Sequence, residues 1–171
     1  FSEWSLGSSI EKGIASLGWE KATWIQFEAI PAARTGRNII GQARTGSGKT
    51  GAFGIPVIER CEPNGSLQAL VLAPTRELAS QVRDEFDDIQ GDKGLTIISV
   101  YGGTDVDKQA KKLDAGVDII VGTPGRVMDM SKRGHIDLAS PAHFILDEAD
   151  RMLDMGFMPD IMWVIERLTN R

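Results

Sequence analysis

Residues 43–50 have the types and the spacing needed to bind phosphate. They read Ala-Arg-Thr-Gly-Ser-Gly-Lys-Thr, between an apolar run that predicts a strand and an amphipathic stretch that predicts a helix. Glycines let backbone N–H groups turn inward around a phosphate, and the helix N-terminus adds a partial positive charge. A chance glycine-rich turn is the weaker alternative, because strand, loop and helix come in the required order. The expected nucleotide contacts are Arg44, Thr45, Gly46, Ser47, Gly48, Lys49 and Thr50.

Two adjacent carboxylates, Asp147 and Glu148, directly follow a second apolar run, 144–146. A carboxylate at the end of a buried strand can hold Mg²⁺, and its neighbour can orient and deprotonate an attacking water. We therefore expect Asp147 and Thr50 to bind the metal, and Glu148 to act on the water while Lys49 contacts the β- and γ-phosphates. The alternative is an acidic helix N-terminus, which the helix dipole favours by itself. The upstream phosphate loop makes this alternative the weaker interpretation.

Short apolar runs and amphipathic stretches alternate along the chain. Strands are predicted at 38–41, 69–73, 96–100, 118–121 and 143–146, and helices at 49–60, 76–89, 105–113 and 126–132, with further helical spacing at 10–17, 25–33 and 161–168. Alternating units of this kind predict an α/β fold, in which helices cover both faces of a parallel sheet. Pro56 interrupts the helix 49–60, where it predicts a kink or an early end.

The composition is that of one ordinary globular domain. The 171 residues are 42% hydrophobic and 25% charged, and the net charge of −5 argues against bulk attraction to nucleic acid but not against a local binding track. The single cysteine, Cys61, cannot form an internal disulfide, which favours a reducing compartment. No apolar run approaches the roughly 20 residues of a membrane helix, and no basic-then-apolar leader opens the chain. We expect no membrane association and a cytoplasmic location, with the nucleus open in a eukaryote.

Residues 147–150 read Asp-Glu-Ala-Asp. Together with the phosphate loop, they resemble the motifs of DEAD-box RNA helicases, a family named after these four letters. Residues 18–26 resemble its Q motif, 74–79 its motif Ia, 102–103 its paired glycines and 123–126 its motif Ib. The resemblance covers essentially the whole chain. It implies a RecA-like P-loop NTPase domain, the N-terminal one of two, with the last part of this domain and all of the second lying outside residues 1–171.

The Q-motif resemblance implies how adenine would be recognised. Gln26 would read the base edge through paired hydrogen bonds, because an amide offers both a donor and an acceptor. Phe1 and Trp19 would pack around the base, and Thr23 also matches the motif. Trp24 stands where the family commonly has proline. On the residues alone, an exposed helix position is the simpler interpretation of Gln26.

The other motifs imply an RNA-binding track. The expected contacts are Pro74, Thr75, Arg76, Gly102, Gly103, Thr123, Gly125 and Arg126. Each cluster follows the carboxyl end of a predicted strand, where open α/β sheets bind their ligands. Such contacts to phosphate and sugar position a strand without reading its sequence. Helix caps and turns are the alternative interpretation of each cluster taken alone.

The resemblance implies an ATP-dependent RNA helicase, an RNA-dependent ATPase that uses ATP and Mg²⁺. The alternatives are an ATP-gated RNA clamp or scaffold and a DNA-directed helicase. The family's arginine finger belongs to the second domain, and losing such a group costs about 10³–10⁵ in rate. We therefore expect residues 1–171 alone to bind nucleotide but to hydrolyse it poorly.

Overall fold

The computed structural model describes residue 1 and residues 4–34 and 48–169. The predicted strand 38–41 and residues 43–47 of the phosphate loop lie outside the described residues. The chain divides into two compact units, the first made of Phe1–Cys61 with Asp84–Gly94 and the second of Glu62–Arg83 with Leu95–Arg171. In the described part of the chain, no helix combines the length and the apolar composition that crossing a bilayer requires.

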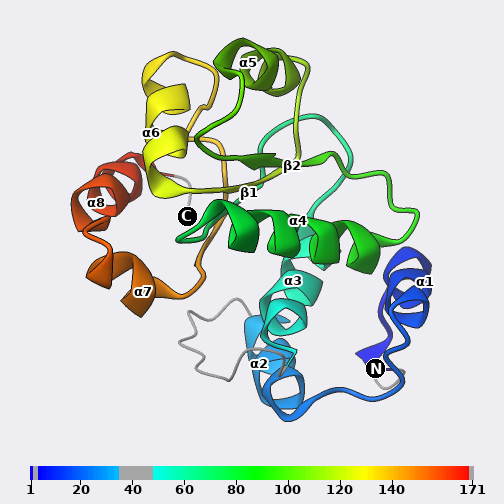
Figure 1. The fold of residues 1–171 in the computed structure, drawn as a ribbon. Coiled ribbons are helices and arrows are strands. Elements are labelled where there is room, and N and C mark those ends of the chain that lie inside the picture. Colours follow the sequence, from blue (N-terminus) through cyan, green and yellow to red (C-terminus); the bar gives the residue numbers. More distant parts are fainter. Residues whose placement is uncertain (2–3, 35–47, 170–171) are drawn as a thin grey trace. The chain divides into compact units, whose positions relative to one another are not determined.

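A parallel sheet organises the second unit. Its strands are β1 (Ala69–Leu72), β2 (Ile97–Val100), β3 (Ile119–Gly122) and β4 (His143–Leu146), each within one residue of its predicted bounds. The strand order is β2-β3-β1-β4, and every pair is parallel (Figure 1). Leu72 lies opposite both Gly122 and Leu146, and Gly122 also lies opposite Val100. The four strands therefore end at the same height in the sheet. The segments that follow them meet along the side of the sheet formed by the carboxyl ends of the strands, which we call the carboxyl edge.

Helices cover both faces of this sheet. One face packs against α5 (Val106–Asp114), α6 (Pro124–Lys132), α7 (Ala149–Asp154) and α8 (Met158–Arg167). Because strand side chains alternate between faces, Leu70 and Leu72 of β1 point together into this core. The first half of α4 (Arg76–Gln90) lies on the other side of the strands (Figure 1), where Arg83 Nε donates to the carbonyl of Ile97 at 3.0 Å. The prediction of an α/β fold with helices on both faces is confirmed.

Gly122, at the end of β3, allows the close approach of α6 and β2. A Cβ at this position would lie 2.5 Å from Val127 Cγ2 and 2.7 Å from the carbonyl oxygen of Val100. We expect Gly122→Ala to lower the free energy of unfolding by about 1–3 kcal/mol, because backbone and core must shift to admit the methyl group. Urea denaturation would measure this change. Gly102→Ala is the control, since a Cβ at Gly102 would meet no atom within 4 Å, and equal losses in the two variants would contradict the packing argument.

The first unit is helical in its described residues. It contains α1 (Ser8–Ser16), α2 (Trp24–Arg34), α3 (Lys49–Arg60) and the second half of α4. Its most buried side chains include Ile30, Ile55 and Phe86, none of which is exposed. The rings of Phe53 and Phe86 lie 5.8 Å apart, so α3 packs against the second half of α4.

Pro56 predicted either a kink or an early end of α3, and the early end is wrong. The helix continues to Arg60 with Pro56 inside it. Proline lacks the N–H that would bond four residues back, and a proline inside a helix costs roughly 3 kcal/mol. Ile55, Val57 and Ile58 around it are buried, and burial contributes about 1.5–3 kcal/mol for each such side chain. Burial of the apolar face therefore outweighs the local penalty.

Polar contacts fix α2 to α3. Arg34 Nε lies 3.2 Å from Glu59 Oε1, and the guanidinium of Arg60 donates to the carbonyl oxygen of Arg34. Burial raises the pKa of Glu59, although Arg34 and the neighbouring cations oppose that shift. Because α2 carries Gln26 and α3 begins with Lys49 and the adjacent Thr50, these contacts help to position the two predicted nucleotide-binding segments.

Candidate functional site

Gln26 links α2 to the beginning of α3. Its side chain is only 1% exposed, so the interpretation of Gln26 as an exposed helix residue is wrong. Its Oε1 accepts a hydrogen bond from the N–H of Thr23 at 3.1 Å, and its Nε2 donates to the carbonyl oxygen of Gly48 at 3.0 Å. An amide has two N–H donors and two acceptor lone pairs. Among the described residues, Gln26 thus acts through its oxygen as an acceptor and through its NH₂ group as a donor, which is the combination that an adenine edge requires.

Two glycines let the Q-motif residues approach the phosphate loop. Gly48 precedes α3 with a positive φ of 87°, and a Cβ there would lie 2.6 Å from both Gln26 Nε2 and Thr23 Oγ1. At Gly51 a Cβ would lie 2.5 Å from Gln26 Nε2 and 2.9 Å from Trp19 Cζ3. Lys49 and Thr50 form the first turn of α3 and are half-buried. The other predicted loop contacts, 44–47, lie outside the described residues.

Aromatic rings gather beside the Q motif. Phe1 stacks on Trp19 with ring centroids 6.3 Å apart and an interplanar angle of 19°. Trp4, to which no motif points, meets Phe1 edge to face, with ring centroids 5.8 Å apart. Trp24 begins α2 and is 73% exposed, so the replacement of the family's usual proline does not prevent a helix there. The structure thus brings Phe1 and Trp19 together, as their predicted shared role requires.

In the second unit, the predicted RNA residues gather at the carboxyl edge. Arg76, at the start of α4, holds its guanidinium carbon 5.0 Å from the centre of the Tyr101 ring. A Cβ at Gly103 would lie 3.5 Å from Arg76 Nη1, so the segments after β1 and β2 are neighbours. The hydroxyl of Thr75 accepts a hydrogen bond from the N–H of Leu78 at 3.2 Å, as the helix-cap interpretation expects. Gly102 and Gly103 are exposed and Pro74 is buried.

A buried glutamine connects two of these segments. Arg126 Nη1 donates to Gln109 Oε1 at 3.0 Å, and Gln109 Nε2 donates to the carbonyl oxygen of Tyr101 at 3.0 Å. Gln109 was not predicted as a site residue. The available signal was a polar residue on the inward face of a helix, at apolar spacing from Val106 and Leu113.

Thr123 and Gly125 lie at the start of α6, after β3. The N–H of Thr123 donates to the carbonyl oxygen of Val100 at 3.0 Å, and Thr123 is the N-cap residue of α6. A Cβ at Gly125 would lie 3.8 Å from Asp160 Oδ2, which places the start of α8 beside this segment. The segment after β3 is therefore held between the end of β2 and the start of α8 at the carboxyl edge.

The carboxylates after β4 lie at the same edge. Asp147 is 5% exposed, and its N–H donates to the carbonyl oxygen of Leu72 at 2.9 Å, which extends the pairing of β4 with β1. Glu148 adopts a left-handed conformation, with φ 54° and ψ 51°, and its Oε2 lies 3.5 Å from Arg151 Nη1. A non-glycine residue held in this region costs about 1–3 kcal/mol, and such strain clusters at active sites.

Each unit offers one oxygen donor of a type that suits Mg²⁺. Magnesium keeps several waters and usually takes only one or two protein carboxylates together with substrate phosphates. Asp147 offers a buried carboxylate and Thr50 a hydroxyl. Among the described residues, no three His, Cys, Asp or Glu side chains gather to hold a metal.

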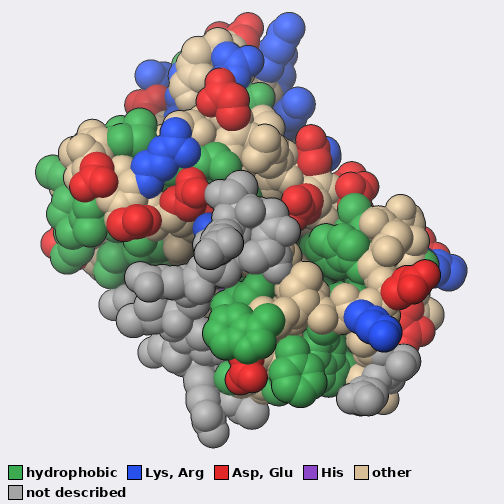
Figure 2. All heavy atoms as spheres, turned by 60° about the horizontal axis from the view of Figure 1, so that its bottom comes forward, with side chains coloured by type: hydrophobic (Ala, Val, Ile, Leu, Met, Phe, Trp, Pro, Cys, Tyr) green, Lys and Arg blue, Asp and Glu red, His purple; other side chains and the backbone are tan. Residues whose placement is uncertain are grey.

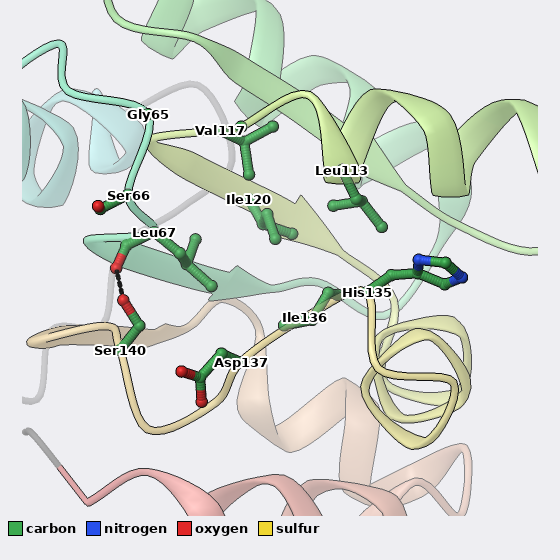
Figure 3. A pocket seen from close by; sticks show the side chains of 11 residues that line it. Gly65, Ser66, Leu67, Leu113, Val117, Ile120, His135, Ile136, Asp137 and Ser140 are labelled. Atoms are coloured by element: carbon green, nitrogen blue, oxygen red, sulfur yellow. Dashed lines mark hydrogen bonds between the residues drawn. The ribbon is translucent and has the colours of Figure 1, made fainter.

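A cavity of about 170 Å³ lies at the opposite edge, where the strands begin (Figure 3). Leu67, Val117, Ile120 and Ile136 point into it, and Ser140 Oγ donates to the carbonyl oxygen of Leu67 at 2.7 Å. None of the predicted site residues described in the structure lines this cavity. The carboxyl edge is therefore the candidate site of the second unit.

Comparisons with known proteins agree with these motifs. A family model described as DEAD/DEAH box helicase matches residues 23–171. The RNA helicase CrhR of Synechocystis sp. is 46% identical over 154 residues, which cover 90% of this chain and 31% of that protein. The DEAD-box ATP-dependent RNA helicase CshA of Streptococcus pneumoniae is 46% identical over 169 residues, which cover 98% of this chain and 32% of that protein.

A solved structure shows the same fold. The crystal structure of a DEAD box protein from the hyperthermophile Methanococcus jannaschii matches with a TM-score of 0.93 and 45% identity, covering 98% of this chain and 46% of that one. The chain spans about a third of the length of the two curated relatives.

Proposed function

Because this chain belongs to the DEAD/DEAH box helicase family, we propose that it is the N-terminal RecA-like domain of an ATP-dependent RNA helicase. One observation carries the proposal. The segments after β1, β2 and β3 and the carboxylates after β4 share one edge of a sheet whose strands end level. Residues suited to RNA phosphates thus lie at the same edge as residues suited to ATP hydrolysis.

The proposed nucleotide contacts divide between recognition and chemistry. Gln26 reads adenine beside Phe1 and Trp19, and the loop 44–48 with Lys49 binds the phosphates. Thr50 and Asp147 would hold Mg²⁺, which would supply positive charge to the phosphates of the nucleotide. Glu148 accepts a proton from the attacking water.

The proposed RNA contacts position a strand without reading its bases. Arg76 and Arg126 supply charge for phosphates, and the exposed Gly102 and Gly103 carry no side chain that would keep an RNA strand away from their backbone. A net charge of −5 leaves little general attraction for RNA, so binding depends on these local groups. We expect little sequence specificity.

A second RecA-like domain is the proposed partner. The relatives are about three times as long as this chain. Hydrophobic side chains gather on the surface of α7 and α8 (Figure 2), which begin next to the carboxyl edge. The exposed members are Leu153, Met155, Met158 and Met162, each between 43% and 46% exposed. Such a surface suits a contact with another domain, and the single cysteine supports a cytoplasmic location.

The proposed function is tested by ATPase assays of the full-length protein with RNA and DNA strands of equal length. We expect stimulation by RNA, since the 2′-hydroxyl distinguishes the two polymers. Equal stimulation by both would indicate a DNA-directed or unselective helicase. RNA binding gated by ATP without turnover would indicate a clamp.

Gln26→Ala is expected to weaken ADP binding about tenfold or more, because two hydrogen bonds to the base and the contact with Gly48 are lost. Calorimetric titration with Mg-ADP and Mg-GDP measures this, and the wild-type protein should bind ADP but not GDP. Gln90→Ala is a matched control, because Gln90 is another buried glutamine of the first unit, bonded to Asp87. Equal binding of ADP and GDP by the wild-type protein would contradict the role of Gln26.

A further inference from the structure

The buried side chain of Gln109 is bonded at both ends. It is 8% exposed, on α5, which the family motifs do not include. Its oxygen accepts from Arg126, while its nitrogen donates to the carbonyl oxygen of Tyr101 and contacts the hydroxyl of Thr104. Thr104 Oγ1 also donates to the carbonyl oxygen of Tyr101, at 3.1 Å. A neutral amide is the side chain that can accept from a guanidinium and donate to a carbonyl at once.

These contacts connect the segments that follow three strands. Gln109 joins Arg126, after β3, to the loop that begins with Tyr101, after β2. The ring of Tyr101 lies against the guanidinium of Arg76, after β1, and Gly103 of the same loop lies beside that guanidinium. One buried amide therefore holds Arg126 directly and fixes the loop against which Arg76 lies.

The contacts of Gln109 and Tyr101 reduce the number of arginine side chains that RNA binding must order. A free arginine side chain samples many rotamers, and ordering such side chains on binding reduces affinity. Arg126 is half-buried and already held by Gln109, and Arg76 is held on the Tyr101 ring. Both cations are thus oriented before a phosphate arrives.

We infer that Gln109 is a positioning residue for the RNA site, which holds Arg126 and the loop 101–104 in the arrangement that binds the RNA backbone. This inference rests on the proposed function. Gln109 touches no RNA itself and acts through Arg126 and Tyr101. A leucine would fill the same space on α5, but it would leave the guanidinium of Arg126 without its Gln109 acceptor, and the carbonyl of Tyr101 would keep only the bond from Thr104.

The test is RNA affinity in the full-length protein, measured by fluorescence anisotropy with a labelled single-stranded oligouridylate and a non-hydrolysable ATP analogue. Gln109→Leu is expected to weaken RNA binding about tenfold, as expected for loss of hydrogen bonds to a charged group. Its affinity for Mg-ADP should equal that of the wild-type protein. Gln109→Glu keeps the acceptor for Arg126 but loses the donor to Tyr101, so it should weaken RNA binding less than Gln109→Leu does.

A double-mutant cycle with Arg126→Ala separates positioning from stability. If Gln109 acts through Arg126, the two substitutions together should weaken RNA binding by less than the product of their separate effects. Gln90→Leu, which removes a buried glutamine from the first unit, should leave RNA affinity unchanged. If Gln109→Leu does not fold, the cycle is repeated with Gln109→Glu and Arg126→Ala, and the same departure from additivity is expected.

The outcomes distinguish this inference from the proposed function. Wild-type affinity in Gln109→Leu, or full additivity with Arg126→Ala, would overturn the positioning role while leaving the RNA site in place. Parallel loss of ADP and RNA binding would also overturn it, since that pattern indicates general destabilisation. A wild-type protein that does not bind RNA would overturn the proposed function itself.

Discussion

Glu148→Gln in the full-length protein is expected to reduce RNA-stimulated ATP turnover about 10²–10⁴-fold, the contribution of a well-placed general base. The substitution replaces one carboxylate oxygen with an NH₂ group, so it keeps the size of the side chain and removes its ability to accept a proton. Affinities for ATP and RNA should change little, because Glu148 is not among the proposed binding contacts. Single-turnover hydrolysis with saturating RNA measures the loss directly.

Two variants control this experiment. Glu166→Gln makes the same chemical change on the exposed surface of α8, where the carboxylate lies 3.9 Å from Arg167, and it should leave turnover unchanged because exposed ion pairs contribute little. Glu148→Gly removes the carboxylate and also the left-handed strain, so it should lose turnover while gaining about 1 kcal/mol of stability. Turnover near the wild-type level in Glu148→Gln would show that another group activates the water.

The sheet could be predicted from the sequence because its strands are continuous apolar runs. All residues of β1 and β3 are buried, and strands covered on both faces show this composition. Local rules failed where packing outweighed them. Pro56 predicts an interruption of the helix, but α3 continues through it because the neighbouring residues bury their side chains. The short helix α7 was not predicted, because its six residues are too few to show a period.

The candidate site was predictable where its residues lie next to one another in sequence. The segments after the strands could be predicted to meet because parallel strands end at one edge. Gln109 and Tyr101 were missed because the contacts that connect them, between α5, the loop after β2 and α6, cannot be inferred from the sequence. The burial of Gln26 could not be predicted either. The sequence shows a polar residue in a predicted helix, but it does not show the carbonyl oxygen of Gly48 to which this side chain donates.

Gly48→Ala is expected to weaken binding of Mg-ADP by about 10–100-fold. Alanine at a φ of 87° is strained by roughly 1–2 kcal/mol, and the added methyl group would lie 2.6 Å from Gln26 Nε2 and Thr23 Oγ1. The backbone can relieve this contact by moving the beginning of α3, or Gln26 can move away. Either movement breaks the hydrogen bond from Gln26 to the carbonyl of Gly48 and separates the proposed adenine contact from Lys49. Each 1.4 kcal/mol lost corresponds to a tenfold weaker affinity.

Gly134→Ala separates the steric effect from the backbone strain. Gly134 has the same φ of 87°, but a Cβ there would meet no atom within 4 Å. Both variants should lose stability through strain, and only Gly48→Ala should also lose ADP affinity in calorimetric titration. Combining Gly48→Ala with Gln26→Ala removes the side chain that the methyl group meets. If the steric contact with Gln26 is the cause, the double variant should bind ADP no more weakly than Gln26→Ala alone, whereas a further tenfold loss would assign the effect to the phosphate loop itself.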